Sequence, residues 1–194
     1  MIQATKVKKD HAAAFGELVI QDGGRMKPLN TFASELLRKM SKRDSYNGLD
    51  ANQVFLSMIM QPALWYNVEF IYLKKGNDSL RSMIGIPAAK KYAKAIDFFD
   101  AKGNYKLAPY LQQAYATNTP NQFQKDFRNA DQELGLLNRA LGGEILKIFP
   151  VPGHENNTWV SYPELSSAGF TGTDSLYVKN ILPMYVQALR AAET

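Results

Sequence analysis

The sequence predicts a mainly α fold, namely an irregular helical domain with a small N-terminal β-hairpin and one or two further short strands. Three observations lead to this prediction. Apolar residues recur at helical spacing in several segments, most clearly within 119–143. Turn residues at 22–24 follow a short β-type run. Apolar residues make up 45% of the 194 residues, which is enough for a folded core and argues against disorder.

The first expected element is the hairpin. Residues 17–21 have β character, and Asp22-Gly23-Gly24 follows them. Glycine tolerates the positive φ that tight hairpin turns require. Residues 25–27 would form the return strand, and Pro28 would end it because proline donates no backbone hydrogen bond.

Two helices are expected next. Asn30 or Thr31 can cap the first, and Asp50 with Gln53 has the spacing of a capping box that opens the second. The apolar positions of the first helix recur every three or four residues. They are Leu29, Phe32, Ala33, Leu36, Leu37 and Met40.

The middle of the chain gives weaker patterns. Residues 68–73 contain β-branched and aromatic side chains and are typical of a strand. Pro87 would be the first residue of a helix over 88–98, and a further helix is expected over 105–116.

The strongest periodicity comes later. Thr119-Pro120-Asn121-Gln122 predicts a helix start, and Gly142-Gly143 predicts its end. Residues 144–151 have some β character, and an irregular stretch is expected from there to about residue 172. Thr173 or Asp174 would begin a final helix that contains Pro183.

Composition excludes several kinds of chemistry. The chain contains no cysteine, which excludes disulfides, thiolate metal sites and cysteine nucleophiles. With only His11 and His154, a histidine-rich metal centre is excluded too. The longest apolar stretches are far shorter than the roughly 18 residues of a membrane span, so we expect a soluble domain.

Positive charge is concentrated near the N-terminus. Residues 1–43 contain nine Lys or Arg against four Asp or Glu, whereas the rest of the chain contains fourteen of each. Such a segment suits anionic lipid headgroups or an acidic partner, and it is also typical of a solvated surface. Aromatic residues do not alternate with these bases, so nucleic-acid binding is not expected.

No motif in the chain predicts an enzyme. Residues 22–27 lack the spacing of a phosphate-binding loop, and Asp97 with Asp100 is typical of an ordinary helix surface. The serines lack the context of a catalytic nucleophile. His154 lies in a polar loop that ends at Trp159, which makes it a slightly better candidate than His11.

One segment carries a resemblance to a known family. Gly24-Arg25-Met26-Lys27-Pro28-Leu29-Asn30-Thr31, with the residues around it over 11–39, resembles part of the fused System II cytochrome c biogenesis proteins, the CcsB–CcsA or ResB–ResC fusions. Pro150-Val151-Pro152 and Asn156-Asn157-Thr158-Trp159 also look like the large extracytoplasmic region of these proteins.

The resemblance implies that the parent protein is a holocytochrome c synthase, which exports haem and attaches it to apocytochrome c. In that family a tryptophan-rich segment and flanking histidines handle the haem. Here Trp65 and Trp159 stand outside any tryptophan-rich run, so we assign no catalytic residue, haem ligand or metal ligand to this chain. The resemblance implies a soluble domain on the periplasmic side of the inner membrane. We expect 1–194 to form one such domain, with 1–16 poorly ordered and both ends cut from a larger membrane protein.

Three roles stay open for such a domain. It could position apocytochrome c beside the membrane surface, or it could be a structural spacer that supports the transmembrane parts of the same protein. Binding of haem or another small molecule within the domain itself is the third role. Arg25, Lys27 and His154 are the candidate residues for a partner or structural surface.

Overall fold

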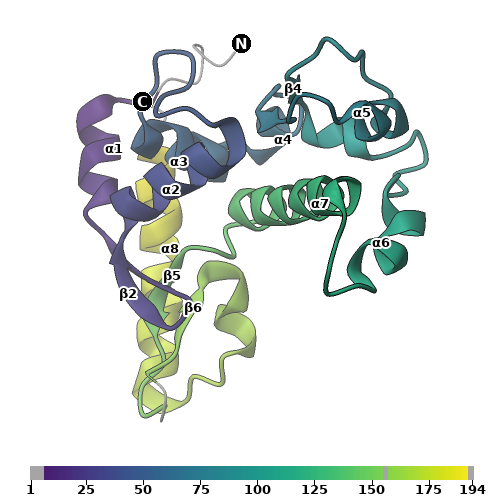
Figure 1. The fold of residues 1–194 in the computed structure, drawn as a ribbon. Helices are drawn as coiled ribbons and strands as arrows, with labels where there is room; N and C mark the ends of the chain where they lie inside the picture. Colours follow the sequence, from purple (N-terminus) through teal and green to yellow (C-terminus); the bar gives the residue numbers. More distant parts are fainter. Residues whose placement is uncertain (1–6, 155–156, 192–194) are drawn as a thin grey trace. The chain divides into compact units, whose positions relative to one another are not determined.

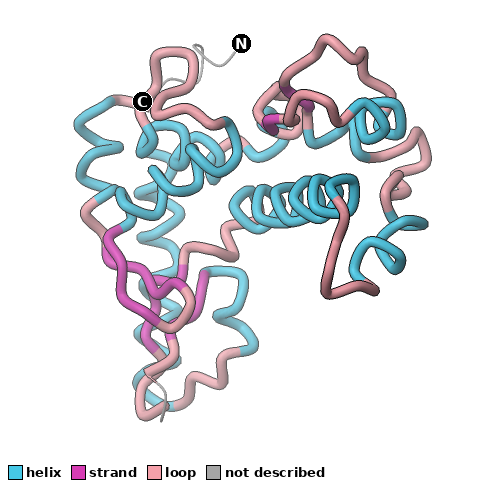
Figure 2. Tube along the Cα trace, in the orientation of Figure 1, coloured by secondary structure: helices cyan, strands magenta, loops and turns pink. Residues whose placement is uncertain are grey.

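A computed structural model describes residues 7–154 and 157–191. The chain divides into two compact units. The first unit comprises Met1–Arg38, Arg43–Pro62 and Arg139–Thr194, and the second comprises Lys39–Lys42 and Ala63–Asn138. Figure 1 gives the order of the elements and Figure 2 their type.

The first unit begins with helix α1 (Lys9–Gly16) and the predicted hairpin. Strand β1 (Val19–Asp22) pairs antiparallel with β2 (Arg25–Pro28), from Val19 opposite Pro28 to Asp22 opposite Arg25. The two turn glycines, Gly23 and Gly24, have φ of 56° and 79°. Positive φ at both central residues is what a two-residue turn of type I′ requires, so the predicted hairpin is confirmed.

Helix α1 packs against α3 (Ala51–Met60). Ala12 is completely buried, and a Cβ on Gly16 would come within 2.6 Å of the Asn52 side chain. Glycine at position 16 therefore allows the two helices to approach closely. Residues 1–6 lie outside the described residues, whereas 9–16 form this helix.

Helix α2 (Leu29–Ser41) buries the apolar stripe that its periodicity predicts. It begins at Leu29, before both expected caps, because the Leu29 backbone N–H donates to the Leu18 carbonyl at 2.8 Å and the chain passes from strand to helix without a break. The predicted capping box of α3 is confirmed, since the Asp50 carboxylate accepts from the Gln53 N–H at 2.9 Å.

The C-terminal part of the first unit contains a second hairpin. Strand β5 (Lys147–Pro150) pairs antiparallel with β6 (Trp159–Ser161), and the short 3₁₀ helix η3 (Tyr162–Ser167) follows. Helix α8 (Gly172–Ala191) contains Pro183 and runs beside β5 in Figure 1. Its residues Val178 and Ile181 pack against a buried cluster of Phe149, Val160 and Leu165.

The second unit is built mainly around helix α7 (Gln122–Leu141), whose expected position is confirmed. Its cap is shifted by two residues, because the Asn121 side chain accepts from the Gln124 N–H and the Gln124 side chain accepts from the Asn121 N–H. The expected helix over 105–116 is present as α6 (Ala108–Tyr115).

The helix predicted over 88–98 is wrong. Strand β4 (Tyr92–Ala93) lies there and pairs with β3 (Ile71–Tyr72), and the 3₁₀ helix η2 (Ala95–Phe98) follows. The Arg81 guanidinium donates to the carbonyl oxygens of Lys90 and Leu73, both at 2.9 Å, and so holds the two segments together. Tertiary pairing therefore outweighs the local helical pattern.

Two further short helices complete the second unit, namely α4 (Pro62–Trp65) and α5 (Asp78–Ile84). The predicted mainly α class is confirmed. The described ranges contain four short strands beyond the N-terminal hairpin, β3 to β6, where one or two were expected. No helix in the described part of the chain combines the length and apolar character needed to cross a membrane.

Candidate functional site

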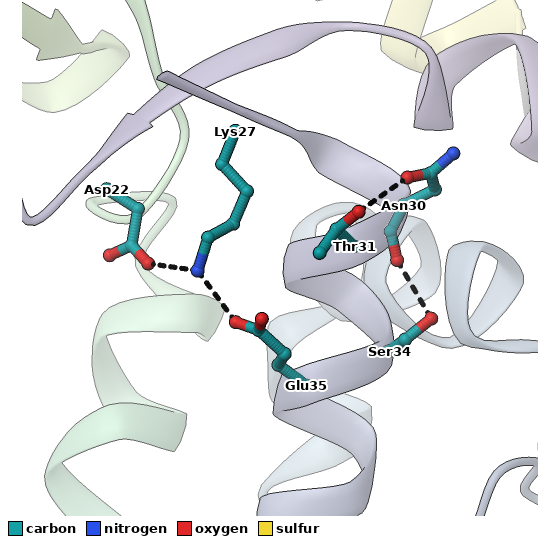
Figure 3. A network of polar contacts seen from close by, with 6 residues as sticks. All are labelled: Asp22, Lys27, Asn30, Thr31, Ser34 and Glu35. Atoms are coloured by element: carbon teal, nitrogen blue, oxygen red, sulfur yellow. Dashed lines mark hydrogen bonds and ion pairs between the residues drawn. The ribbon is translucent and has the colours of Figure 1, made fainter. Parts of the chain in front are cut away.

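The segment that carries the family resemblance forms a junction between the hairpin and α2 (Figure 3). Lys27 extends from β2, and its Nζ lies 2.8 Å from Asp22 Oδ2 and 2.7 Å from Glu35 Oε2. Asp22 ends β1 and Glu35 lies on α2. These hydrogen-bonded carboxylates raise the pKa of the Lys27 ammonium above its usual value. We name these three residues the Lys27 clasp.

The rest of the segment has local structural roles. Thr31 Oγ1 donates to Asn30 Oδ1 at 3.2 Å, and Ser34 Oγ donates to the Asn30 carbonyl at 2.8 Å (Figure 3). Leu29 is buried, whereas Arg25 and Met26 are exposed. The segment is therefore shaped mainly by the turn from hairpin to helix, and its exposed side chains include those of Arg25, Met26, Asn30 and Thr31.

Gln21 connects the two hairpins of the first unit. Its Nε2 donates to the Asn157 carbonyl at 2.8 Å, and its Oε1 accepts from the Trp159 N–H at 2.8 Å. One amide side chain thus supplies both a donor and an acceptor to the backbone of the β5–β6 hairpin. Gln21 was not predicted from the sequence, because glutamine in a short strand has no distinctive local pattern.

His154 lies in the turn between β5 and β6 and is exposed. Its Nδ1 is 3.1 Å from Thr158 Oγ1. Arg25 and Lys27 lie together on β2, and Gln21 joins their hairpin to the one that carries His154. Among the described residues no group of His, Asp and Glu has an arrangement that could hold a metal ion. The role of these three residues as a partner surface stays a prediction.

An apolar groove of about 720 Å³ lies in the first unit. Residues from α1 and β1, from β5, and from α8 with the loop before it contribute to its walls. Asp174 is the only charged residue among the described residues that line it. The lining residues are Phe15, Leu18, Val19, Ile148, Phe149, Pro150, Pro152, Phe170, Asp174, Val178, Ile181 and Met184.

Several side chains of the groove are open to solvent. Met184 is 66% exposed and Val19 is 46% exposed, and Leu18 is also exposed. A groove of this kind favours an apolar ligand or an apolar polypeptide segment. The groove could not be predicted from the sequence, because its walls come from segments that are more than 120 residues apart in the chain.

Comparisons with known proteins give one clear similarity. The chain is 33% identical to Protein NrfI of Wolinella succinogenes over 163 residues, which are 82% of this chain and 18% of NrfI. The chain therefore spans less than a fifth of the length of this relative. No protein-family model matches the chain.

Proposed function

We propose that this chain is a periplasmic-side domain of a System II cytochrome c biogenesis protein, in which the apolar groove of the first unit holds unfolded apocytochrome c. Attachment of haem would be the work of other parts of that protein. The similarity to NrfI over most of the chain supports cytochrome c maturation as the general role. The segment 24–31 supports the fused CcsB–CcsA type.

The groove is the observation that carries the proposal. An apocytochrome that awaits haem is unfolded and presents apolar side chains that the haem-bound protein later buries. The groove offers aromatic, aliphatic and methionine side chains to such a segment. Methionine adapts to varied apolar surfaces, which suits a site that accepts different sequences. Its one acidic residue, Asp174, favours a segment that also carries a Lys or Arg.

Charge in the N-terminal third contributes less to this proposal than the groove does. Lys27 is neutralised by the two carboxylates of the Lys27 clasp, and Arg38 pairs with Asp44. Lys42 pairs with Glu133, so at least three of the nine bases within residues 1–43 have an acidic partner. Binding that depends on apolar contact should change little between low and moderate salt.

A labelled apocytochrome peptide that contains the Cys-x-x-Cys-His motif and its apolar flanks tests the proposal. Fluorescence anisotropy should show saturable binding to the 194-residue chain at both salt concentrations. Met184→Glu places a charge in the groove and should weaken binding at least about ten-fold. Leu176→Glu is the matched control, because Leu176 is 59% exposed on the same helix and does not line the groove.

Absence of peptide binding at both salt concentrations contradicts the proposal. Equal weakening by Met184→Glu and Leu176→Glu contradicts the assignment to the groove. Circular dichroism of both variants checks that α8 still forms.

A structural role is the second candidate, and the Lys27 clasp favours it. The clasp joins the hairpin to α2 and accounts for the resemblance segment without any partner. In this role the domain would support the transmembrane parts of the parent protein. Deletion of the domain from the full-length protein would then lower the amount of protein but leave haem attachment per molecule unchanged.

Binding of haem within this domain is the third and least supported role. His154 is exposed and contacts Thr158, and its imidazole is accessible in the turn that carries it. Addition of haem should shift the Soret band if this role holds, and His154→Ala should abolish the shift. An unchanged spectrum removes this candidate.

A further inference from the structure

The second unit contains a pocket of a different kind from the groove of the first unit. It has a volume of about 130 Å³ and is lined by residues from the end of α2, from the β3–α5 segment and from α7. Its lining contains two lysines, two carboxylates and two asparagines, together with the apolar residues Leu73, Leu80 and Ala130. The polar residues are Lys42, Lys74, Asn77, Asp126, Asn129 and Glu133.

Glu133 is a buried carboxylate in the wall of this pocket. The residue is 8% exposed, and its Oε1 lies 3.4 Å from Lys42 Nζ. That distance is longer than the 2.7–2.9 Å typical of a strong charge-assisted hydrogen bond. Burial raises the pKa of the Glu133 carboxyl, and Lys42 opposes this shift. The carboxylate thus has unused capacity to accept hydrogen bonds from a cation.

Lys42 supplies positive charge at the rim. It follows the last residue of α2 and has φ of 57°, a left-handed conformation that is uncommon for a lysine. In this conformation its ammonium reaches the Lys39 carbonyl at 2.8 Å as well as Glu133. Lys74 is exposed and lines the pocket from the β3–α5 segment.

Asn77 adds an amide group to the lining of the pocket. The residue is 6% exposed and lines the pocket, and its side chain makes no capping hydrogen bond to α5. Asn77 therefore offers a donor and an acceptor to whatever occupies the pocket.

The charges of the lining restrict the class of ligand. A simple anion would be repelled by Asp126 and Glu133, and a simple cation would be repelled by Lys42 and Lys74. A molecule with one positive and one negative group can match both pairs. The volume suits a small molecule, because a cavity of about 150 Å³ accommodates a ligand of the size of benzene.

We propose that this pocket binds a small zwitterion, namely a free α-amino acid with a short apolar side chain. The ammonium group lies against Glu133 and the Asn77 amide, and the carboxylate faces Lys42 and Lys74. The short side chain packs on Leu73, Leu80 and Ala130. This site is independent of the groove and of the proposed role in cytochrome c maturation.

Titration of the 194-residue chain with L-alanine, followed by backbone amide NMR, tests the proposal. Alanine should cause saturable shifts at residues of the pocket, including Asn77 and Glu133. N-acetylalanine lacks the ammonium and alaninamide lacks the carboxylate. Each compound should therefore bind at least about ten-fold more weakly than alanine. Equal binding of the three compounds, or no shift with alanine, overturns the proposal.

Two pairs of variants locate the site. Lys74→Ala should weaken binding of alanine several-fold, whereas Lys75→Ala changes an adjacent exposed lysine outside the pocket and should have no effect. Glu133→Gln should remove binding, whereas Glu144→Gln alters an exposed glutamate of the first unit and should not. Lys74 is exposed, so Lys74→Ala keeps the proposal falsifiable even if a change at Glu133 affects folding. Loss of binding in the Lys75→Ala control overturns the assignment.

Discussion

The two units hold their short strands in place with different kinds of contact. In the first unit, Lys27 and Gln21 join hairpins and helix through side chains near the surface. In the second unit, Arg81 of α5 is buried, and its guanidinium donates hydrogen bonds to the backbone next to β3 and β4. The units also differ in what they leave open, which is an apolar groove in the first and a polar pocket in the second.

This difference shows how each candidate site arises from the packing around it. The polar residues of the first unit are used to connect elements, and apolar side chains are left to line the groove. In the second unit several polar side chains hydrogen-bond to one another, as when Tyr105 and Tyr115 both donate to Asp131. Others, such as Asn77, line the pocket.

The chain offers a direct way to follow each unit separately. Trp65 belongs to the second unit and Trp159 to the first, and the chain contains no other tryptophan. Fluorescence in a Trp159→Phe background therefore reports unfolding of the second unit, and fluorescence in a Trp65→Phe background reports the first.

The largest effect is expected at Arg81. Arg81 is 3% exposed, and Arg81→Ala leaves the carbonyl oxygens of Leu73 and Lys90 without this donor. We expect the free energy of unfolding of the second unit to fall by about 3–6 kcal/mol, because two hydrogen bonds from a charged group are lost and each contributes about 1.5–3 kcal/mol. Urea denaturation followed by Trp65 fluorescence measures this change.

Lys91→Ala is the control for Arg81→Ala, since Lys91 is an exposed cation of the same segment. A loss of less than about 1 kcal/mol in Arg81→Ala would mean that β3 and β4 stay paired without the guanidinium.

Gln21 should have the next largest effect, and on the first unit. Gln21→Ala removes two hydrogen bonds to the β5–β6 hairpin. Each such bond contributes about 0.5–1.5 kcal/mol, so the free energy of unfolding should fall by about 1–3 kcal/mol. Denaturation followed by Trp159 fluorescence measures it, with Gln187→Ala on α8 as the control. An unchanged midpoint contradicts a connecting role for Gln21.

The smallest effect is expected at the Lys27 clasp. Both carboxylates of the clasp are partly exposed, and ion pairs of this kind contribute about 0.2–1 kcal/mol each. Lys27→Met should therefore lower the free energy of unfolding of the first unit by about 1 kcal/mol. Added salt should reduce the difference between the variant and the original chain.

The Lys27 clasp also has a defined pH dependence. The pKa of Lys27 is raised above 10.5 in the folded chain, so its contribution is fully present below pH 10.5 and is lost as the pH rises through the folded pKa. Lys27→Met should remove this alkaline loss, which denaturation curves on either side of pH 10.5 can detect. If the Lys27→Met variant loses the same amount of stability as the pH rises, groups other than Lys27 cause the loss.

Sequence patterns predicted the elements whose signals are local. The stripe of α2, the capping box of α3 and the position of α7 all follow from side chains within one or two helical turns of each other. The glycines of the first hairpin likewise specify their own turn. Only β5 of the second hairpin was predicted. Its partner β6 lies in a stretch rich in turn residues and forms by pairing with β5.

The candidate residues were predicted less well than the elements. Lys27 was selected for its position in the resemblance segment, and its two carboxylate partners emerged only in the structure. Gln21 and Asn77 were not selected, since their importance comes from what lies opposite them.

By itself, the sequence determined the mainly α class, the first hairpin and the absence of cysteine chemistry, because periodicity, turn glycines and composition act locally or through the chain as a whole. Only the tertiary structure decided the extended conformation around Tyr92, the apolar groove and the polar pocket. Each of these depends on residues brought together from distant parts of the chain, and such contacts leave no spacing in the sequence from which to infer them.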